Sequence, residues 1–342
     1  MRHAIRTMLA AVFALAVPGS AMAVPGSAMA ETQPAGPTVS IAFVGDVMLD
    51  DGPGRAIRRG LDPVAPFAAI LDAADIRVGN LECVVATGGT PEPGKPFTFR
   101  AHPRTLKVLK RHFDALGLAN NHSGDYGPDA FREMLGLLDR EGIARFGGGH
   151  DLAQAHAPLV IERHGLRIAL LGYNEFFPRW FEADEDKPGI AWSEDEQVRQ
   201  DIRNARLRHG ADLVIPVMHW GWEHERIASS RQRALARLMI DAGADAVVGG
   251  HPHVTQDVEQ YRGKPIIYSL GNFVFDGFTD PGNNTGWLLR MELDRAGVRA
   301  WRTVVAHIDR QGIPRPAAGV AGACWQRGQD ESAACAGAPR LP

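Results

Sequence analysis

The chain has little cysteine, little lysine and almost no excess of either charge. Of its 342 residues three are cysteine, and the formal net charge is −3. A nearly neutral chain lacks the basic footprint of a nucleic-acid-binding protein, so we expect no nucleic-acid partner. Among the strong bases arginine dominates, because lysine occurs only at Lys95, Lys107, Lys110, Lys187 and Lys264.

The N-terminal apolar run is too short to cross a membrane. A spanning helix needs about twenty apolar residues, and the run at 8–17 has about half of that. It follows a basic start at Arg2 and Arg6 and precedes the small-residue cleavage signals at 21–23 and 28–30. Residues 1–30 are therefore predicted to be a signal peptide of an exported, periplasmic or cell-envelope protein. An uncleaved N-terminal anchor is the alternative.

Export determines how the three cysteines are interpreted, because exported proteins meet an oxidising environment. Cys324 and Cys335 bracket a segment without a core pattern, and a disulfide between them would fasten it. Cys83 follows Glu82 at the end of an apolar run, where a small buried hydrophobic residue is the simpler interpretation.

Helical and strand patterns alternate over most of the chain. Apolar periodicity predicts helices at 64–73, 103–112, 128–142, 194–208 and 231–242, and a loop at 50–60. Asp129 and Ser229 or Ser230 are candidate caps, and Gly142 is a candidate helix end. Alternating apolar residues at 287–293 and 298–307 predict a hairpin. The pattern favours an α/β sandwich whose sheet gains antiparallel strands late in the chain.

This pattern gives the domain organisation. After residues 1–30 come a linker at 31–37, a folded domain at 38–309 and a Pro/Ala/Gly-rich tail at 310–342 that we expect to be poorly ordered from Gln311 onward. The long irregular stretch at 174–194 is a candidate lid or binding loop.

Five predicted strands end in residues that can bind metal or move protons. In open α/β sheets the site lies beyond the carboxyl ends of the strands, so these residues should converge. The most informative pair is His251 and His253, which flank a proline directly after an apolar run. The full set is Asp46, Glu82, Asn121, His122, His219, His251 and His253.

The composition of this set indicates two metal ions rather than one. Two carboxylates, an amide oxygen and several imidazoles exceed the needs of one tetrahedral ion and suit two ions that share a carboxylate. Mixed nitrogen and oxygen ligands without thiolate favour Mn, Fe or Zn over Ca or Mg. Paired ions of this kind perform hydrolytic chemistry at phosphorus or carbonyl centres.

These residues lie in motifs that resemble a known family. Gly45–Met48, Asn80–Glu82, Ala119–His122 with Asp125, Met218–Gly221, Gly250–His253 and Tyr268–Phe273 resemble, in the same order, the CapA family. This is the poly-gamma-glutamate capsule biosynthesis group of the calcineurin-like metallophosphoesterase superfamily. The resemblance covers residues from about Ser40 to Asp276.

The resemblance implies a fold and a role for each site residue. The fold is a four-layer α/β/β/α sandwich of two mixed sheets flanked by helices, with a dinuclear centre. Asp46 and His253 would bind the first ion, Glu82 would bridge, and Asn121, His219 and His251 would bind the second. His122 would be the acid or transition-state stabiliser beside them, with Asp125 as its hydrogen-bond acceptor or as a helix cap.

One position departs from the superfamily pattern. Its first motif usually reads Asp-x-His, and this chain has Met48 in place of the histidine. Glu223 or a water could complete the first site. Asn272 is a further candidate for the lining of the site, and Arg100 is a candidate contact for an anionic substrate.

Three functions fit these motifs. The first is an exported metal-dependent protein that synthesises, transfers or trims an anionic cell-surface polymer such as poly-gamma-glutamate, with hydrolase chemistry. The second is a periplasmic phosphoesterase of small phosphoesters. The third is a non-catalytic accessory subunit that binds the polymer or a membrane synthase.

Overall fold

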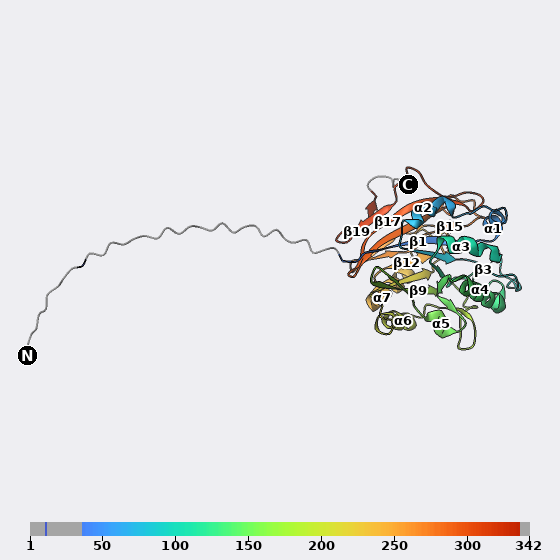
Figure 1. Cartoon of the computed structure of the whole chain (residues 1–342), viewed down its shortest axis with the longest axis horizontal. Helices are drawn as coiled ribbons and strands as arrows, with labels where there is room; N and C mark the ends of the chain where they lie inside the picture. Colours follow the sequence, from blue (N-terminus) through green and yellow to red (C-terminus); the bar gives the residue numbers. More distant parts are fainter. Residues whose placement is uncertain (1–10, 12–35, 336–342) are drawn as a thin grey trace, which may run out of the picture. The chain divides into compact units, whose positions relative to one another are not determined.

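Two mixed β-sheets make up the frame of the computed structural model (Figure 1). Residue 11 and residues 36–335 are described, so the expected signal peptide, apart from residue 11, and linker residues 31–35 lie outside the described residues. Within the described part, no helix is both long enough and apolar enough to cross a membrane.

The larger sheet has ten strands and combines the two ends of the domain. β1 lies between β16, to which it is antiparallel, and β2, to which it is parallel. Figure 1 shows blue β1 close to orange β17, and β16 lies between these two strands in the sheet order. In order, the strands are β20 (Ala333–Ala334), β19 (Ala323–Gln326), β17 (Gly297–Ile308), β16 (Thr285–Asp294), β1 (Val39–Val47), β2 (Ile76–Leu81), β5 (Ala115–Gly117) and β6 (Ala144–Phe146), with β15 (Asn272–Val274) on β1 and β18 (Pro314–Pro316) on β17.

The second sheet has six strands and a parallel centre. Its order is β13 (Val258–Tyr261), β14 (Lys264–Ile267), β12 (Val247–Gly250), β11 (Leu213–His219), β9 (Leu166–Asn174) and β8 (Leu159–Arg163). Only the edge strands β13 and β8 run antiparallel to their neighbours. Two short pairs complete the described strands, β3 (Val84–Val85) with β4 (Arg100–Ala101) and β7 (Gly148–Gly149) with β10 (Gly189–Ile190).

Apolar side chains on both faces of each sheet let the two sheets pack against each other and against helices, which gives four layers: helices, sheet, sheet and helices. Successive side chains of a strand point to opposite faces of its sheet. Accordingly, Ile41 and Phe43 of β1 join a core cluster formed by residues of both sheets, while Ala42 and Val44 join a cluster with the helices. The six-stranded sheet is likewise apolar on both faces, and its outer face packs against α6 and α7. The predicted sandwich of two mixed sheets flanked by helices is confirmed.

The helices cover the outer faces of the two sheets. Their bounds are α1 (Asp51–Arg58), α2 (Ala68–Asp72), α3 (Leu106–His112), α4 (Gly127–Glu141), α5 (Leu152–His156), α6 (Asp195–Leu207) and α7 (Ser230–Ala242), with short 3-10 turns η1 (Ala65–Phe67) and η2 (Pro103–Thr105).

Most predicted helix ends are confirmed, with two corrections. Ser229 caps α7, and Gly142 ends α4 in the left-handed conformation. Asp129 is not a cap, because α4 already begins at Gly127 and Asp129 lies in its first turn. The loop expected at 50–60 is wrong, since α1 occupies most of it. Pro53 is tolerated there because it lies in the first turn, where a backbone N–H has no partner within the helix.

The expectation of a poorly ordered tail is wrong for residues 314–334. β18, β19 and β20 join the ten-stranded sheet, and Trp325 of β19 is buried against Trp301 of β17. The predicted disulfide between Cys324 and Cys335 is present. A buried tryptophan and a cross-link order a segment whose small residues carry no periodic signal.

Candidate metal centre

The predicted site residues converge where strands of both sheets end. Asp46 lies near the end of β1, and Glu82 directly follows β2 of the same sheet. His219 ends β11, and His251 directly follows β12 of the other sheet. All four side chains are buried. Parallel strands bring their carboxyl ends to one edge, and the two sheets place these edges together.

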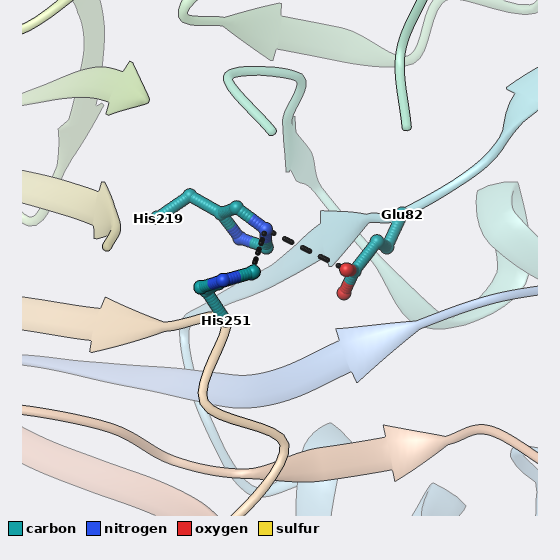
Figure 2. Close-up of side chains that lie close together, drawn as sticks. All are labelled: Glu82, His219 and His251. Atoms are coloured by element: carbon teal, nitrogen blue, oxygen red, sulfur yellow. Dashed lines mark hydrogen bonds and ion pairs between the residues drawn. The ribbon is translucent and has the colours of Figure 1, made fainter. Parts of the chain in front are cut away.

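One group of potential ligands consists of Glu82, His219 and His251. Figure 2 shows the two imidazoles and the carboxylate turned toward one another. His219 Nε2 lies 3.5 Å from Glu82 Oε1 and 3.1 Å from His251 Nδ1. The Asn121 amide oxygen lies 2.7 Å from the same His219 nitrogen, so it belongs to this group as well.

The second group consists of Asp46, Glu82 and His253. His253 lies 3.5 Å from Asp46 Oδ2 through Nδ1 and 3.8 Å from Glu82 Oε1 through Nε2. Glu82 is thus common to both groups. A carboxylate in this position can bridge two ions, one in each group.

The burial and the raised pKa values of the two carboxylates, Asp46 and Glu82, indicate a place for a cation. Both oxygens of Glu82 are buried and have no hydrogen-bond partner among the residues that the structure describes. Burial, followed by the nearby charge of Asp46, raises the pKa of Glu82 well above its ordinary value. Burial also raises the pKa of Asp46, against the attraction of His253. A buried carboxylate without a partner is unfavourable, and a bound cation would remove that penalty.

The electrostatics of His219 and His251 also fit a bound metal ion, because both imidazoles are held in the neutral form. Burial lowers the pKa of His219 and of His251 well below the ordinary value, and the neighbouring imidazoles lower it further. Neutral imidazole is the form that binds a metal ion. His251 Nε2 is also buried without a hydrogen-bond partner.

Backbone strain marks the loop that carries the His251 and His253 pair. His251 has φ 93° and His253 has φ 56°, both in the left-handed region that non-glycine residues avoid. Hydrogen bonds hold the loop in this form: the backbone N–H of His251 donates to Asp46 Oδ2 at 3.3 Å, and the Asn283 amide donates to the His253 carbonyl at 3.0 Å. Such strain is typical of functional sites.

His122 and Asp125 form a dyad beside the two groups. His122 Nδ1 lies 2.7 Å from Asp125 Oδ2, which also accepts the Phe99 N–H at 2.7 Å. Asp125 is fully buried, and burial lowers the pKa of His122. The hydrogen bond fixes the imidazole and leaves Nε2 as its free nitrogen. Of the two interpretations given for Asp125, the structure favours the hydrogen-bond acceptor, because Tyr126 occupies the N-cap position of α4 and no side chain caps this helix.

The remaining candidates occupy different places. Asn272 is buried, with its amide oxygen 2.8 Å from His253 Nδ1. Arg100 is engaged elsewhere, because its guanidinium donates to the Gly88 carbonyl at 2.9 Å and stacks on Tyr126. Glu223 is exposed and lies outside both groups, although its charge contributes to the raised pKa of Glu82.

Met48 supplies nothing to the first group. It is buried in the apolar cluster beneath the helices of the ten-stranded sheet, and its sulfur accepts the N–H of Asp50 at 3.1 Å. The position at which this chain departs from the Asp-x-His pattern is therefore part of the core.

Two polar residues near the site were missed by the sequence reasoning. Asn80 donates to Asp46 Oδ1 at 2.8 Å and lies 3.3 Å from His219 Nδ1. Its place two residues before Glu82 could have indicated this role. Lys95 contacts Asp125 and the carbonyl of Asn121. It comes from an irregular loop, where no periodic pattern predicts the direction of a side chain.

The segment at 174–194 reaches the site through an aromatic ring. The rings of Phe176 and His251 have centroids 4.0 Å apart, and Phe176 also contacts Trp222. Trp222 and Phe177 are largely exposed. The expected binding loop therefore adjoins the ligand groups, and its role as a lid remains a prediction.

Sequence comparisons match the same part of the chain. The family model of the bacterial capsule synthesis protein PGA_cap matches residues 40–277. The PGA biosynthesis protein CapA of Bacillus subtilis (strain 168) is 36% identical over 247 residues, which are 70% of this chain and 63% of that protein. The chain thus matches less than two thirds of that relative's length.

Further similarities were found in sequence and in structure. The capsule biosynthesis protein CapA of Bacillus anthracis is 31% identical over 290 residues, covering 81% of this chain and 69% of that protein. Among solved structures, the NAD nucleotidase NadN of Haemophilus influenzae aligns with a TM-score of 0.45 and 14% identity, over 82% of this chain and 54% of that chain. The family match includes every residue of both ligand groups, and the chain belongs to the bacterial capsule synthesis protein PGA_cap family.

Proposed function

We propose that this protein is an exported metal-dependent hydrolase that acts in the synthesis, transfer or trimming of an anionic cell-surface polymer of the polyglutamate type. The observation that carries the proposal is the position of Glu82, buried without a hydrogen-bond partner and common to two groups of potential ligands. Two divalent transition-metal ions, Mn, Fe or Zn, would satisfy its oxygens and the mixed donor set.

The chemistry follows from the residues around Glu82. When bound, two such ions supply an attacking water at neutral pH and offset negative charge that develops on the substrate. Asp46 and His253 would hold one ion, Asn121, His219 and His251 the other. His122, held by Asp125 through Nδ1, would act through Nε2. Nε2 would give a proton to the departing atom from the imidazolium form, which the charge of Asp125 favours.

The polymer and its location are inferred from relatives and from chain chemistry. One relative is named for PGA biosynthesis and one for capsule biosynthesis, and a relative from Mycobacterium tuberculosis is named as a probable polyglutamine synthesis accessory protein. The disulfide between Cys324 and Cys335 fits an oxidising compartment. Membrane proteins of capsule synthesis are the proposed partners.

Metal content and hydrolysis together test the proposal. The protein from residue 31 onward is analysed by elemental mass spectrometry, then assayed with Mn²⁺ on poly-gamma-glutamate and on an aryl phosphate. We expect two ions per chain and turnover of the polymer, both lost in Asp46→Ala and His251→Ala while the fold is kept. Full activity in these variants would refute the metal mechanism. Turnover of the aryl phosphate alone would instead favour a phosphoesterase of small phosphoesters.

A non-catalytic accessory role is the second candidate, and Met48 favours it. With Met48 in the core, the described residues offer the first group Asp46, Glu82 and His253 as potential carboxylate and imidazole ligands, and no further histidine. A weakly held first ion would leave a protein that binds polymer or a membrane synthase without cleaving it. Polymer binding that is unchanged in His122→Ala, together with no turnover in the wild type, would support this role.

A further inference from the structure

Lys95 joins three segments at the edge of the proposed metal centre. It lies in the loop between β3 and β4, and its side chain is largely buried. Its ammonium donates to the fully buried Asp125 and to the backbone carbonyl of Asn121. It also lies over the ring of Trp180, 5.3 Å from the centroid, in the 174–194 segment.

These contacts place a fixed cation beside the potential ligands. The positive charge of Lys95 contributes to the lowered pKa values of His122, His219 and His251, and it opposes the rise for Glu82. By charge alone, Lys95 therefore repels any metal ion in this site. A largely buried cation that opposes metal binding needs another explanation.

We propose that Lys95 is a positioning residue, which holds the turn at 121–125 so that Asn121 faces His219 and His122 keeps its bond to Asp125. This inference rests on the proposed metal centre. Two donor contacts to one turn fix both its backbone and its buried carboxylate, and both adjacent side chains, Asn121 and His122, depend on that turn. Groups that orient metal ligands typically change metal affinity or activity about 10- to 100-fold when removed.

The direction in which Mn²⁺ affinity changes in a variant without the Lys95 charge separates a positioning role from a purely electrostatic one. In Lys95→Met the repulsion disappears, so a purely electrostatic role predicts tighter Mn²⁺ binding. Positioning predicts the opposite, because the Asn121 turn loses its anchor. We expect isothermal titration calorimetry to give about 10-fold weaker binding in Lys95→Met. Lys95→Arg, which keeps the charge and can donate to both acceptors, should stay close to the wild type.

The controls separate this inference from the proposed function. Lys107→Met removes an exposed lysine of α3 and should leave Mn²⁺ affinity unchanged. Unchanged or tighter binding in Lys95→Met would overturn the positioning role. If Lys95→Met unfolds, Lys95→Gln, which also lacks the charge, decides by the same sign: weaker Mn²⁺ binding in the folded variant supports positioning, and unchanged or tighter binding overturns it. A wild type that binds Mn²⁺ without hydrolysis would refute only the proposed function. A wild type that binds no Mn²⁺ would refute both.

Discussion

At the scale of single residues, Glu82 is a carboxylate whose ionised form is strongly disfavoured in the metal-free protein. It is fully buried, its pKa is raised by the nearby charge of Asp46, and within the described part of the chain neither of its oxygens has a hydrogen-bond partner. The same carboxylate lies close to His219 on one side and His253 on the other. A residue that destabilises the metal-free fold is therefore the one best placed to join two ions.

The raised pKa of Glu82 predicts a pH-dependent effect of Glu82→Gln. At pH values above the ordinary glutamate pKa, the unfolded chain has released the Glu82 proton, whereas the folded metal-free protein still keeps it. The stability from Glu82 is therefore lost as pH rises toward its folded pKa. We expect chelator-treated Glu82→Gln to gain stability relative to the wild type as pH rises from about 5 to 8, measured by urea unfolding.

Two results complete this test. Glu185→Gln, at an exposed position, should follow the wild type at every pH. With excess Mn²⁺ the order should reverse, because only the wild type offers a bridging carboxylate. Unfolding curves for Glu82→Gln that stay parallel to the wild type across the pH range would contradict the prediction.

At the scale of elements, the end of β1 depends on close approach of two backbones. The backbone N–H of Asp46 donates to the Gly271 carbonyl at 3.0 Å, and the pairing of β1 with β2 is irregular between Phe43 and Asp46. A Cβ on Gly45 would lie 1.9 Å from that same carbonyl oxygen. Gly45 thus allows β1 and the chain at Gly271 to approach closely directly before Asp46.

Gly45→Ala should therefore affect stability and metal binding together. The added methyl forces β1 and the chain at Gly271 apart, for which overpacking in cores suggests a loss of about 1–3 kcal/mol. Chemical denaturation measures this loss, and elemental analysis should find less metal. Gly36→Ala is the matched control, because its Cβ would meet nothing within 4 Å. Wild-type stability in Gly45→Ala would contradict the packing argument.

The C-terminal strands β19 and β20 depend on the disulfide between Cys324 and Cys335. The disulfide closes a loop with a sequence separation of 11, and the Trp325 indole donates to the Gln329 carbonyl at 2.8 Å within it. Cys324→Ser with Cys335→Ser should lower the free energy of unfolding by about 2–3 kcal/mol, measured in urea. Metal content should stay the same, because none of the potential ligands lies in this loop. Loss of metal would show that the loop supports the site.

At the scale of the whole molecule, the proposed centre joins the two sheets. Glu82 comes from the ten-stranded sheet, and His219 and His251 come from the six-stranded sheet. An ion bound by all three would add a link across the core between the sheets. Metal binding should therefore stabilise the complete domain rather than one loop.

Metal removal tests this coupling directly. Ligand linkage predicts about 2.7 kcal/mol of stabilisation at a free concentration 100 times the Kd, so EDTA should lower the Tm and Mn²⁺ should restore it. One cooperative transition, shifted as a whole, is expected by calorimetry. A Tm that is unchanged by chelation and by Mn²⁺ would contradict a metal link between the sheets.

The sequence by itself determined much of the fold and the identity of the potential ligands. Apolar runs that end in polar residues placed Asp46, Glu82, His219 and His251 at strand ends, because side-chain polarity and the strand period can be read from the local sequence. Motif order indicated the family. The same local reasoning failed in two places. At 50–60 it predicted a loop, but Pro53 lies in the first turn of a helix. After Gln311 it predicted a poorly ordered tail, but burial of Trp325 orders the segment.

Only the tertiary structure decided which of these residues act together. Glu82 is common to two groups because strand ends from both sheets meet around it. This brings together residues as far apart in sequence as Asp46 and His251, which are separated by 205 positions. Lys95, in a loop without periodicity, could be placed beside Asp125 only once the β3–β4 pair was formed. The Arg100 guanidinium donates to the carbonyls of Gly88 and Gly89, contacts that the sequence did not predict. Such long-range contacts depend on packing, which no local pattern encodes.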